Sequence, residues 1–333
     1  MTLTSAELLA RRLPPGVVHQ FAPLDTPAAA RGFLAHWGPD LAVFVESELW
    51  PNLLLVAKTT GARLALVSAR VSENSARGWT RAPASAAVLL RTFDLILTQD
   101  GLTAARLSSL GGRVDGRLDL KRFGQPLPAD EAALATLQSA AGGRPVLLAA
   151  STHGMEEAYA LDAFSQVRDD PSRPILVLAP RHPARGPEIH AFAEREHGPA
   201  TLASAGRAFG AQAVHVADTL GELGLWMRLA RGVFVGGGLD TDAGGHNPLE
   251  PARLDCPLAS GPDVDNWRSV YADLNAAGGV TWVRDADELA AFWRQAIDPA
   301  QPLRARAERA RVVVEQGSSA LDAAVARLLA LLP

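Results

Sequence analysis

The chain is short of cysteine, of long apolar runs and of excess charge of either sign. Its 333 residues contain one cysteine, Cys256, which excludes an internal disulfide and a multi-cysteine metal site and fits a reducing compartment. No segment approaches the roughly 18 continuous apolar residues of a membrane-spanning helix. The opening residues MTLTS also lack the basic and apolar regions of a signal peptide. From the residues alone we expect a chain that is neither exported nor anchored.

The charge pattern excludes another class of protein. Lys and Arg number 32 against 36 Asp and Glu, for a formal net charge of -4. A chain without an excess of basic residues is not expected to have nucleic acid as its main partner. No HxH or HExxH spacing is present, so we expect neither a metal site nor a metal cofactor.

What the sequence does contain is enough apolar material for two domains, since 48% of the residues are hydrophobic. Short β-branched or Leu-rich runs alternate with longer amphipathic segments, which predicts an α/β fold with parallel sheets covered by helices on both faces. The proline-rich segment 125–130 predicts a domain boundary, and 303–332 is expected to be helical with an interruption near 317–319. The expected strands are 17–21, 41–45, 64–68, 95–98, 146–150, 175–179, 213–216, 233–235, 257–260 and 281–283.

The stretch GGGLDTDAGGHNPLEPARLDCPLASGP at 236–262 combines a glycine-rich loop with a helix start. Asn247 is expected to be the N-cap, Pro248 the first helical residue and Glu250 the partner in a capping box. A strand, a glycine loop and a helix in this order can bring backbone N–H groups to a phosphate. A well-capped helix after a long loop is the equally plain alternative.

Other predicted strands of the second half also end in polar residues. Because the carboxyl ends of parallel strands meet at one edge of a sheet, these residues predict a nucleotide or sugar-phosphate site there. The alternatives are a surface ion pair for the arginine and structural hydrogen bonds for the histidines. The residues concerned are Ser151, Thr152, His153, Arg181, His182, the segment 219–222 and His246.

In the first half, VFVESELWPNLL at 43–54 places Glu46 and Glu48 where a strand ends. Such carboxylates can act as a general base or bind sugar hydroxyls; alternatively, they complement the dipole of the next helix. Trp50 is expected to pack in the core rather than to stack on a ligand. Ser68 and Arg70 end the next strand and are expected at the same edge.

Seven motifs of the chain resemble, in order and spacing, the 3-deoxy-D-manno-octulosonic acid (Kdo) transferases of lipopolysaccharide synthesis. The resemblance implies the GT-B fold, in which two Rossmann-like domains face each other across a cleft. It assigns the acceptor to 1–124, the donor CMP-Kdo to 125–315, and a helix packing back onto the first domain to 316–333. The motifs are ESELWPN (46–52), SARVSENSARGW (68–79), ASTHGMEE (150–157), APRHP (179–183), DTLGELG (218–224), FVGGG (234–238) and GGHNPLEPA (244–252).

The resemblance also implies roles for individual residues. Arg181 suits the donor phosphate and Glu250 the ribose hydroxyls, while Glu46 or Glu48 is the expected transition-state residue. The residues matching CMP contacts are Pro180, Arg181, Leu220, Gly221, Glu222, Asn247, Pro248, Leu249 and Glu250. Further cleft candidates are Arg70, Ser151, Thr152, His153, Gly245 and His246.

The sequence departs from the family at two places. The family's membrane-anchoring segment and its Ser-Val-Gly-Glu motif, whose Glu is the general base, are not matched, and 2–14 resemble a segment that follows the family's second strand. We therefore expect an incomplete, less stable and self-associating N-terminal domain, in which 17–21 pairs with 41–45 or leaves a gap. The family's Gly-Asn-Leu-Lys-Phe-Asp is GRLDLK at 116–121, so Asp119 replaces the lysine. Lys121, two residues on, is a candidate substitute.

The expected function is transfer of Kdo from CMP-Kdo to a lipid A precursor at the cytoplasmic side of the inner membrane, without a cofactor. Full-length members are expected to contact the membrane surface. A general base contributes about 10²–10⁴-fold, so the chain as given is expected to transfer Kdo slowly or not at all. A non-catalytic CMP-binding relative is the alternative. A GT-B nucleotide-sugar epimerase is a third, against which ELWPN argues.

Overall fold

The computed structural model describes residues 13–206, 208–239, 243–300, 302–315 and 318–333. The chain divides into two compact units, which we call unit 1 (Met1–Lys121 with Ser319–Pro333) and unit 2 (Arg122–Ser318). The division falls three residues before the 124/125 boundary expected from the sequence. The expectation about MTLTS, most of the segment 2–14, and residues 240–242 of the glycine-rich stretch lie outside the described residues.

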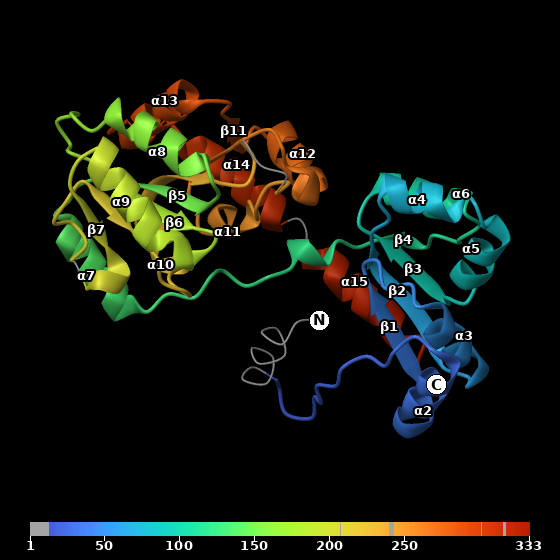
Figure 1. The fold of residues 1–333 in the computed structure, drawn as a ribbon. Helices are drawn as coiled ribbons and strands as arrows, with labels where there is room; N and C mark the ends of the chain where they lie inside the picture. Colours follow the sequence, from blue (N-terminus) through green and yellow to red (C-terminus); the bar gives the residue numbers. More distant parts are fainter. Residues whose placement is uncertain (1–12, 207, 240–242, 301, 316–317) are drawn as a thin grey trace. The chain divides into compact units, whose positions relative to one another are not determined.

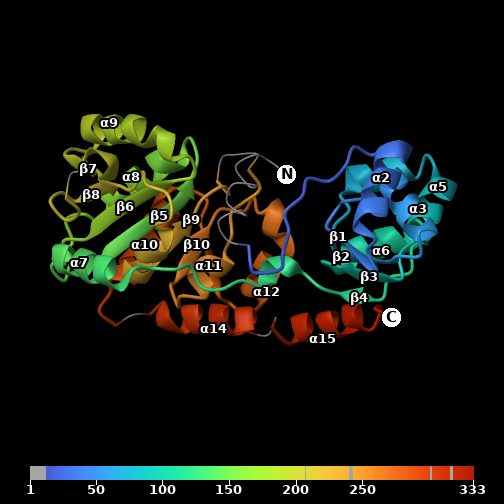
Figure 2. The same cartoon turned by 90° about the horizontal axis from the view of Figure 1, so that it is seen from below.

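Unit 1 is built on a parallel sheet with strand order β1-β2-β3-β4. Helices α2, α3, α5 and α6 pack on one face through a shared apolar core, and α15 lies along the other face (Figure 2). The elements are α2 (Pro27–Trp37), β1 (Leu41–Val45), α3 (Pro51–Thr59), β2 (Arg63–Ala69), α4 (Glu73–Trp79), α5 (Pro83–Leu90), β3 (Leu95–Thr98), α6 (Gly101–Ser109), β4 (Gly116–Arg117), η1 (Leu120–Arg122) and α15 (Ser318–Leu329).

Unit 2 has a larger parallel sheet, in the order β11-β10-β9-β5-β6-β8-β7 (Figure 1). Helices α8, α9 and α13 bury one face, while α7, α10, α11, α12 and α14 bury the other. The elements are α7 (Glu131–Ala141), β5 (Val146–Thr152), α8 (Glu156–Ser165), β6 (Ile175–Pro180), η2 (Pro183–Arg185), α9 (Gly186–Glu196), β7 (Ala200–Leu202), η3 (Ala203–Ala205), β8 (Val214–Val216), α10 (Leu223–Leu229), β9 (Ala230–Val235), α11 (Leu249–Ala252), β10 (Leu258–Ser260), η4 (Asp265–Trp267), α12 (Arg268–Ala276), β11 (Val280–Trp282), α13 (Ala286–Ile297) and α14 (Arg304–Glu315).

Local sequence explains where several of these elements begin and end. Helix α2 starts after Thr26, whose side chain accepts a hydrogen bond from Ala29 N–H, and it ends at Gly38 in the left-handed region. Helix α13 starts after Asp285, which caps Glu288 N–H. Strands β5 and β6 are apolar and buried along nearly their whole length, because helices cover both faces of the sheet.

The expected strand at 17–21 is wrong. These residues form no strand, and Val17 and Val18 are 51% and 68% exposed. Its pairing with β1 is therefore wrong too, and β1 forms an edge of the described sheet. A short β-branched run forms a strand only where a neighbouring strand takes up its backbone hydrogen bonds. Conversely, the short strands β4 and β7 were not expected from the sequence.

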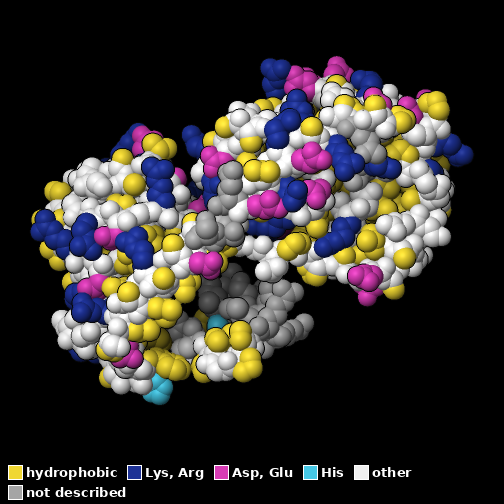
Figure 3. Space-filling view, turned by 180° about the vertical axis from the view of Figure 1, so that it is seen from behind, with side chains coloured by type: hydrophobic (Ala, Val, Ile, Leu, Met, Phe, Trp, Pro, Cys, Tyr) yellow, Lys and Arg dark blue, Asp and Glu magenta, His cyan; other side chains and the backbone are white. Residues whose placement is uncertain are grey.

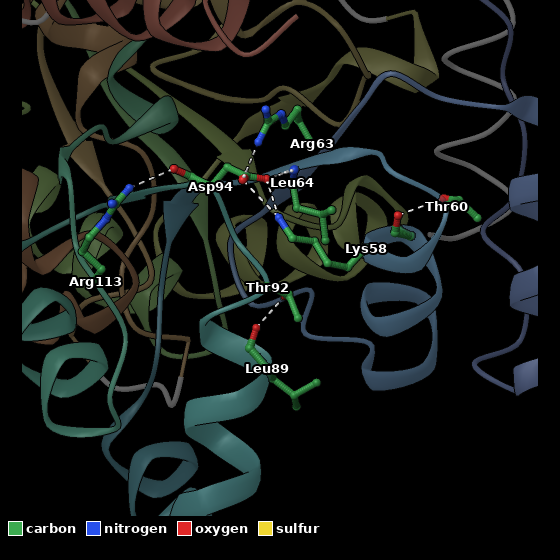
Figure 4. Close-up of polar contacts among 9 residues, drawn as sticks. Lys58, Thr60, Arg63, Leu64, Leu89, Thr92, Asp94 and Arg113 are labelled. Carbon is green, nitrogen blue, oxygen red and sulfur yellow. Dashed lines mark hydrogen bonds and ion pairs between the residues drawn. The ribbon is translucent and has the colours of Figure 1, made fainter.

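At the amino-terminal edge of the unit 1 sheet, Asp94 ties together a helix end and two strands (Figure 4). Its carboxylate accepts hydrogen bonds from Lys58 Nζ at 3.0 Å, Arg63 Nη1 at 3.2 Å and Leu64 N–H at 2.9 Å. Arg113 donates to the Asp94 carbonyl oxygen. Partial burial acts to raise the pKa of Asp94, but these hydrogen bonds and cations hold it below the usual value.

The surface carries charge of both signs. Lys and Arg side chains lie interspersed with Asp and Glu side chains in Figure 3, as the nearly balanced composition leads one to expect. None of the described helices combines the length and the apolar character that crossing a membrane requires.

Candidate functional site

The carboxyl edge of the unit 2 sheet brings together the polar residues that the sequence placed after separate strands. Strands β5, β6 and β9 are parallel neighbours, so their ends at Thr152, Pro180 and Val235 lie at one edge. Arg181 N–H donates to Thr152 O, and Gly236 N–H donates to Ala150 O. Ser151 adopts a positive φ of 55°, which is uncommon for a residue with a side chain and is found disproportionately at functional sites.

The glycine loop after β9 is occupied by a carboxylate of the protein itself. Glu156, which is fully buried, accepts hydrogen bonds from the backbone N–H groups of Gly237, Gly238 and Leu239 at 2.8–3.1 Å. It also accepts one from His153 N–H at 3.0 Å. The N–H groups of Gly237, Gly238 and Leu239 are therefore already engaged and are not offered to a phosphate. The same geometry that suits a phosphate also suits a carboxylate.

A second buried carboxylate lies next to the first on α8. Glu157 accepts hydrogen bonds from Thr152 Oγ1 at 2.9 Å and from Arg185 Nη1 at 2.9 Å. Thr152, a cleft candidate from the sequence, is fully buried and serves this internal network. These contacts hold α8 and η2 to the end of β5.

Three histidines gather at the same edge. The Nε2 atoms of His153 and His246 lie 2.7 Å apart, with the two ring planes 12° from parallel, and His182 meets His153 edge to face. Burial lowers the pKa of His246 to about 4, and His153 and Arg181 act in the same direction. Burial also lowers the pKa of His153, although Glu156 opposes this. His153 and His246 are therefore neutral near pH 7.

Arg181 is the exposed cation of this edge. Within the described residues, no ion pair or side-chain hydrogen bond is formed by its guanidinium group, so the surface ion pair considered as an alternative is not found there. Its positive charge acts to lower the pKa values of His153, His246 and Glu250. All three side chains therefore lie near Arg181. An unengaged guanidinium at a sheet edge can bind an anion bidentately.

The helix expected to begin at about Asn247 is shorter and starts later. Helix α11 covers only Leu249–Ala252, with Pro248 at the N-cap position. Asn247 Oδ1 accepts a hydrogen bond from Leu249 N–H at 3.0 Å, and Asn247 Nδ2 donates to Glu250 Oε1 at 3.2 Å. The expected capping box is therefore replaced by a side-chain pair. Burial raises the pKa of Glu250, while its bond to Asn247 acts to lower it.

The segment before α10 is the most exposed of the predicted donor contacts. Leu220 is 85% exposed, and Gly221 has a φ of +89°, a conformation that favours glycine. Thr219 Oγ1 donates a hydrogen bond to Glu222. This bond positions the Glu222 carboxylate beside the turn.

Unit 1 has its own polar edge, at the carboxyl ends of β1, β2 and β3. Glu46 follows β1 with a positive φ of 60° and Ser68 lies in β2 with a φ of 53°, so both have the backbone strain typical of functional sites. Gln99 Nε2 donates to Glu46 Oε1 at 3.4 Å and to Ser68 Oγ at 3.2 Å. Lys121 Nζ lies 3.8 Å from Glu46 Oε1. The conjectured substitute lysine is thus next to the acidic motif.

Asp119, in contrast, points into the fold. It is 7% exposed and accepts a hydrogen bond from Lys121 N–H at 3.1 Å. Asp119 thus supports the backbone that carries Lys121, the cation beside Glu46 at this edge.

The remaining predicted residues of unit 1 are arranged around the same loop. Trp50 is 45% exposed and donates from Nε1 to Glu48, so the expectation that Trp50 packs in the core is wrong. Ser47 Oγ donates to Arg70 O at 2.6 Å. Glu48 is therefore held beside Trp50, and Glu46 is the carboxylate beside Lys121.

Sequence reasoning missed Glu156, Glu157, Gln99 and Arg185. Both glutamates lie within the motif ASTHGMEE, but acidic residues in the first turn of a helix ordinarily complement its dipole at the surface, so no signal in the sequence indicated that these two are buried. Gln99 had no signal either, since a glutamine at a strand end is ordinarily a surface residue.

Comparison with known proteins identifies the chain's relatives. A family model described as 3-deoxy-D-manno-octulosonic-acid transferase (kdotransferase) matches residues 1–121. The 3-deoxy-D-manno-octulosonic acid transferase of Rickettsia felis is 29% identical over 330 residues, covering 96% of this chain and 69% of the relative. That of Bordetella pertussis is 33% identical over 304 residues, covering 88% of this chain and 68% of the relative.

Solved structures agree with these relatives. The C-terminal CMP-Kdo binding domain of WaaA from Acinetobacter baumannii is 28% identical with a TM-score of 0.50, covering 54% of this chain and 98% of that domain. A putative UDP-N-acetylglucosamine 2-epimerase from Listeria monocytogenes has a TM-score of 0.60 at 13% identity, covering 97% of this chain and 87% of that one. The latter likeness shows a shared GT-B-like α/β fold. Taken with the relatives, these findings show that the chain belongs to the 3-deoxy-D-manno-octulosonic acid transferase family of glycosyltransferases.

Proposed function

We propose that unit 2 binds CMP-Kdo at the carboxyl edge of its sheet and that unit 1 presents a lipid A precursor to it. The single observation that carries the donor assignment is Arg181, an exposed guanidinium without a partner in the described residues. It stands beside Glu250, whose partly buried carboxylate suits hydroxyl groups. The likeness to a CMP-Kdo binding domain supports the same assignment.

The anion-binding groups of this edge differ from those that the sequence suggested. Since Glu156 fills the glycine loop and α11 is only four residues long, neither backbone feature supplies the phosphate site. We assign the phosphate to Arg181. The exposed turn at Leu220 and Gly221 and the Asn247–Glu250 pair then bind the nucleoside. Pro248 and Leu249 then position that pair, and Gly245 and His246 lie beside it.

The reaction is displacement at the anomeric carbon of Kdo. An acceptor hydroxyl oxygen forms a bond to that carbon, the bond to the phosphate oxygen breaks, and CMP leaves with the electron pair. A base takes the hydroxyl proton, and cationic groups stabilise the charge on the leaving phosphate. Arg181 suits the second task. For the first, Glu46 is the carboxylate of unit 1 that is 43% exposed and next to Lys121. No cofactor or metal is needed for these steps.

We place this reaction at the cytoplasmic side of the inner membrane, where a lipid A precursor is reached from the surface. The proposal rests on the chemistry of the acceptor, which is a lipid. A chain that binds CMP without transferring Kdo is the competing function, and the experiment below separates the two.

The donor assignment is tested with Arg181→Ala. Loss of a charged hydrogen bond to phosphate should weaken CMP binding by roughly 1.5–3 kcal/mol, measured by calorimetry, and should slow transfer from CMP-Kdo to a lipid A precursor in parallel. Arg195→Ala, which removes an exposed arginine of α9, is the matched control. Undiminished CMP affinity in Arg181→Ala would remove that residue from the site. CMP binding without any transfer by the wild-type chain would favour the non-catalytic alternative.

A further inference from the structure

The histidine pair at the edge of unit 2 has a geometry that ordinary packing does not require. The Nε2 atoms of His153 and His246 are 2.7 Å apart, which is hydrogen-bonding distance. A neutral imidazole has one N–H donor and one acceptor nitrogen. At this distance only one proton fits between the rings, so one Nε2 donates and the other accepts.

Such a pair can take up a proton without breaking its contact. The ring that donates through Nε2–H has its Nδ1 unprotonated, because it is neutral. A further proton goes to that Nδ1 and makes the donor ring an imidazolium, while the Nε2–H to Nε2 bond remains and gains strength from the charge. Within the described residues, no other group forms a hydrogen bond to either Nδ1.

The charges around the pair keep it neutral while no anion is bound. Arg181 and His182 face it from the end of β6 and oppose protonation, and burial opposes it most. Glu156 and Glu157 on α8 act in the other direction on His153. Both of these carboxylates are already engaged, by backbone N–H groups and by Arg185 respectively. Whether the pair is protonated therefore depends on whether an additional negative charge is bound beside it.

We propose that the His153–His246 pair is an anion-responsive part of the donor site and takes up one proton when a nucleotide phosphodiester binds beside Arg181. The proposal rests on the donor site assigned above and deepens it. A unit charge about 4 Å away in a partly buried site is worth roughly a thousandfold in a protonation equilibrium. This is enough to charge the pair near neutral pH, although burial holds the pKa of His246 at about 4 in the free protein.

The function of the proton is to add a second positive charge where the leaving phosphate develops its own charge. The free site then keeps neutral imidazoles, which cost less to bury than cations. Binding becomes tighter as the pH falls, because the complex holds one more proton than the free protein. One proton corresponds to up to about tenfold in affinity per pH unit.

The test is calorimetry with cytidine 5′-(methyl phosphate), a diester that does not itself titrate between pH 5.5 and 7.5. Titrations of the whole chain in buffers of different ionisation enthalpy give the number of protons taken up. We expect close to one proton for the wild type and a rise in affinity of up to about tenfold per pH unit. His246→Gln removes one imidazole of the pair and should show clearly lower proton uptake and a weaker dependence of affinity on pH. His190→Gln, which alters a histidine of α9 bonded to Ala200 O, is the control and should keep both.

His153→Gln is the second variant, in case His246→Gln does not fold. Its amide can still form a hydrogen bond to His246 but cannot take up a proton, so proton uptake should fall in this variant too. Wild-type binding that is independent of pH and buffer would overturn the proposal and leave the donor site standing. Undiminished proton uptake in both glutamine variants would overturn it as well. Failure of the diester to bind the wild type at any pH would instead refute the donor site itself.

Discussion

Both sheets of this protein are parallel, yet their carboxyl edges have opposite chemistry. In unit 1 the edge presents an acid, because Glu46 is 43% exposed and bonded only weakly, to Gln99 at 3.4 Å and Lys121 at 3.8 Å. In unit 2 the acids Glu156 and Glu157 are buried and engaged by backbone and arginine donors. The charged group that we assign to this edge of unit 2, Arg181, is exposed.

This difference is what the proposed division of a transfer reaction between the two edges requires. A partly exposed carboxylate can accept a proton, whereas a guanidinium can bind an anion. In unit 2 the buried carboxylates have a structural task, since they fix the glycine loop and the end of β5. Which side chain is buried, and not which residue types are present, decides the chemistry of each edge.

The largest effect is expected from the exposed acid of unit 1. Glu46→Gln keeps the size of the side chain but removes its basicity, so transfer of Kdo should fall by about 10²–10⁴-fold. CMP affinity should stay unchanged, since the residue lies in the other unit. Initial rates with CMP-Kdo and a lipid A precursor measure the transfer activity, and calorimetry measures the CMP affinity. Glu73→Gln, in an exposed pair with Arg77 on α4, is the control. An unchanged rate in Glu46→Gln would show that the edge of unit 1 supplies no base through this residue.

Replacing the buried Glu156 of unit 2 should lower the stability of the fold more than it weakens donor binding. Glu156→Gln replaces one acceptor oxygen by an NH₂ group that faces backbone donors, which should cost about 2–3 kcal/mol of unfolding free energy. Denaturant unfolding measures this cost. Glu188→Gln, on the exposed face of α9, should change stability little. If the two variants were equally stable, the glycine loop would not depend on the Glu156 carboxylate.

A smaller effect is expected at the opposite edge of unit 1. Asp94→Asn should lower the unfolding free energy by roughly 1–2 kcal/mol, because the hydrogen bonds from Lys58, Arg63 and Leu64 lose their charged acceptor. The pKa of Asp94 is lowered in the folded state, so this stability is present above the pKa of the unfolded chain and is lost as the pH falls through the folded value.

Thermal unfolding of the wild type and of Asp94→Asn from pH 7 to pH 2.5 checks this sign. The difference between them should shrink as the medium becomes acidic. Asp40→Asn, an exposed neighbour at the same edge, is the control. A difference that grows towards low pH would contradict the assignment.

The smallest effect on stability is expected on the edge strand β1. Val43 and Val45 are 43% and 40% exposed on a strand with one described neighbour, an arrangement that favours association between copies. Val43→Thr with Val45→Thr should change unfolding free energy by less than about 0.5 kcal/mol each but reduce self-association in sedimentation velocity. Val88→Thr, exposed on α5, should leave association as it is. Identical sedimentation of all three proteins would exclude β1 as the contact.

Many of the strands could be predicted from the sequence, and each wrong prediction has a particular physical cause. The apolar runs at 146–150 and 175–179 predict β5 and β6 because strands buried on both faces need near-continuous apolar residues. The run at 17–21 has similar composition, yet no described strand lies beside it to accept its hydrogen bonds. Asn247 and Pro248 have the right spacing for a helix start, but the side chain of Glu250 bonds to the Asn247 amide instead of to its backbone.

The sequence by itself determined the family, the parallel α/β fold and the strand ends at which Glu46, Arg181 and His153 lie, because motifs and apolar periodicity are local properties of the chain. Only the tertiary structure decided that Glu156 fills the glycine loop and that the Nε2 atoms of His153 and His246 meet at 2.7 Å. These outcomes depend on which side chains reach the same point from distant segments. Once buried there, a carboxylate must find N–H donors and an imidazole must find a partner, and no local pattern specifies which ones.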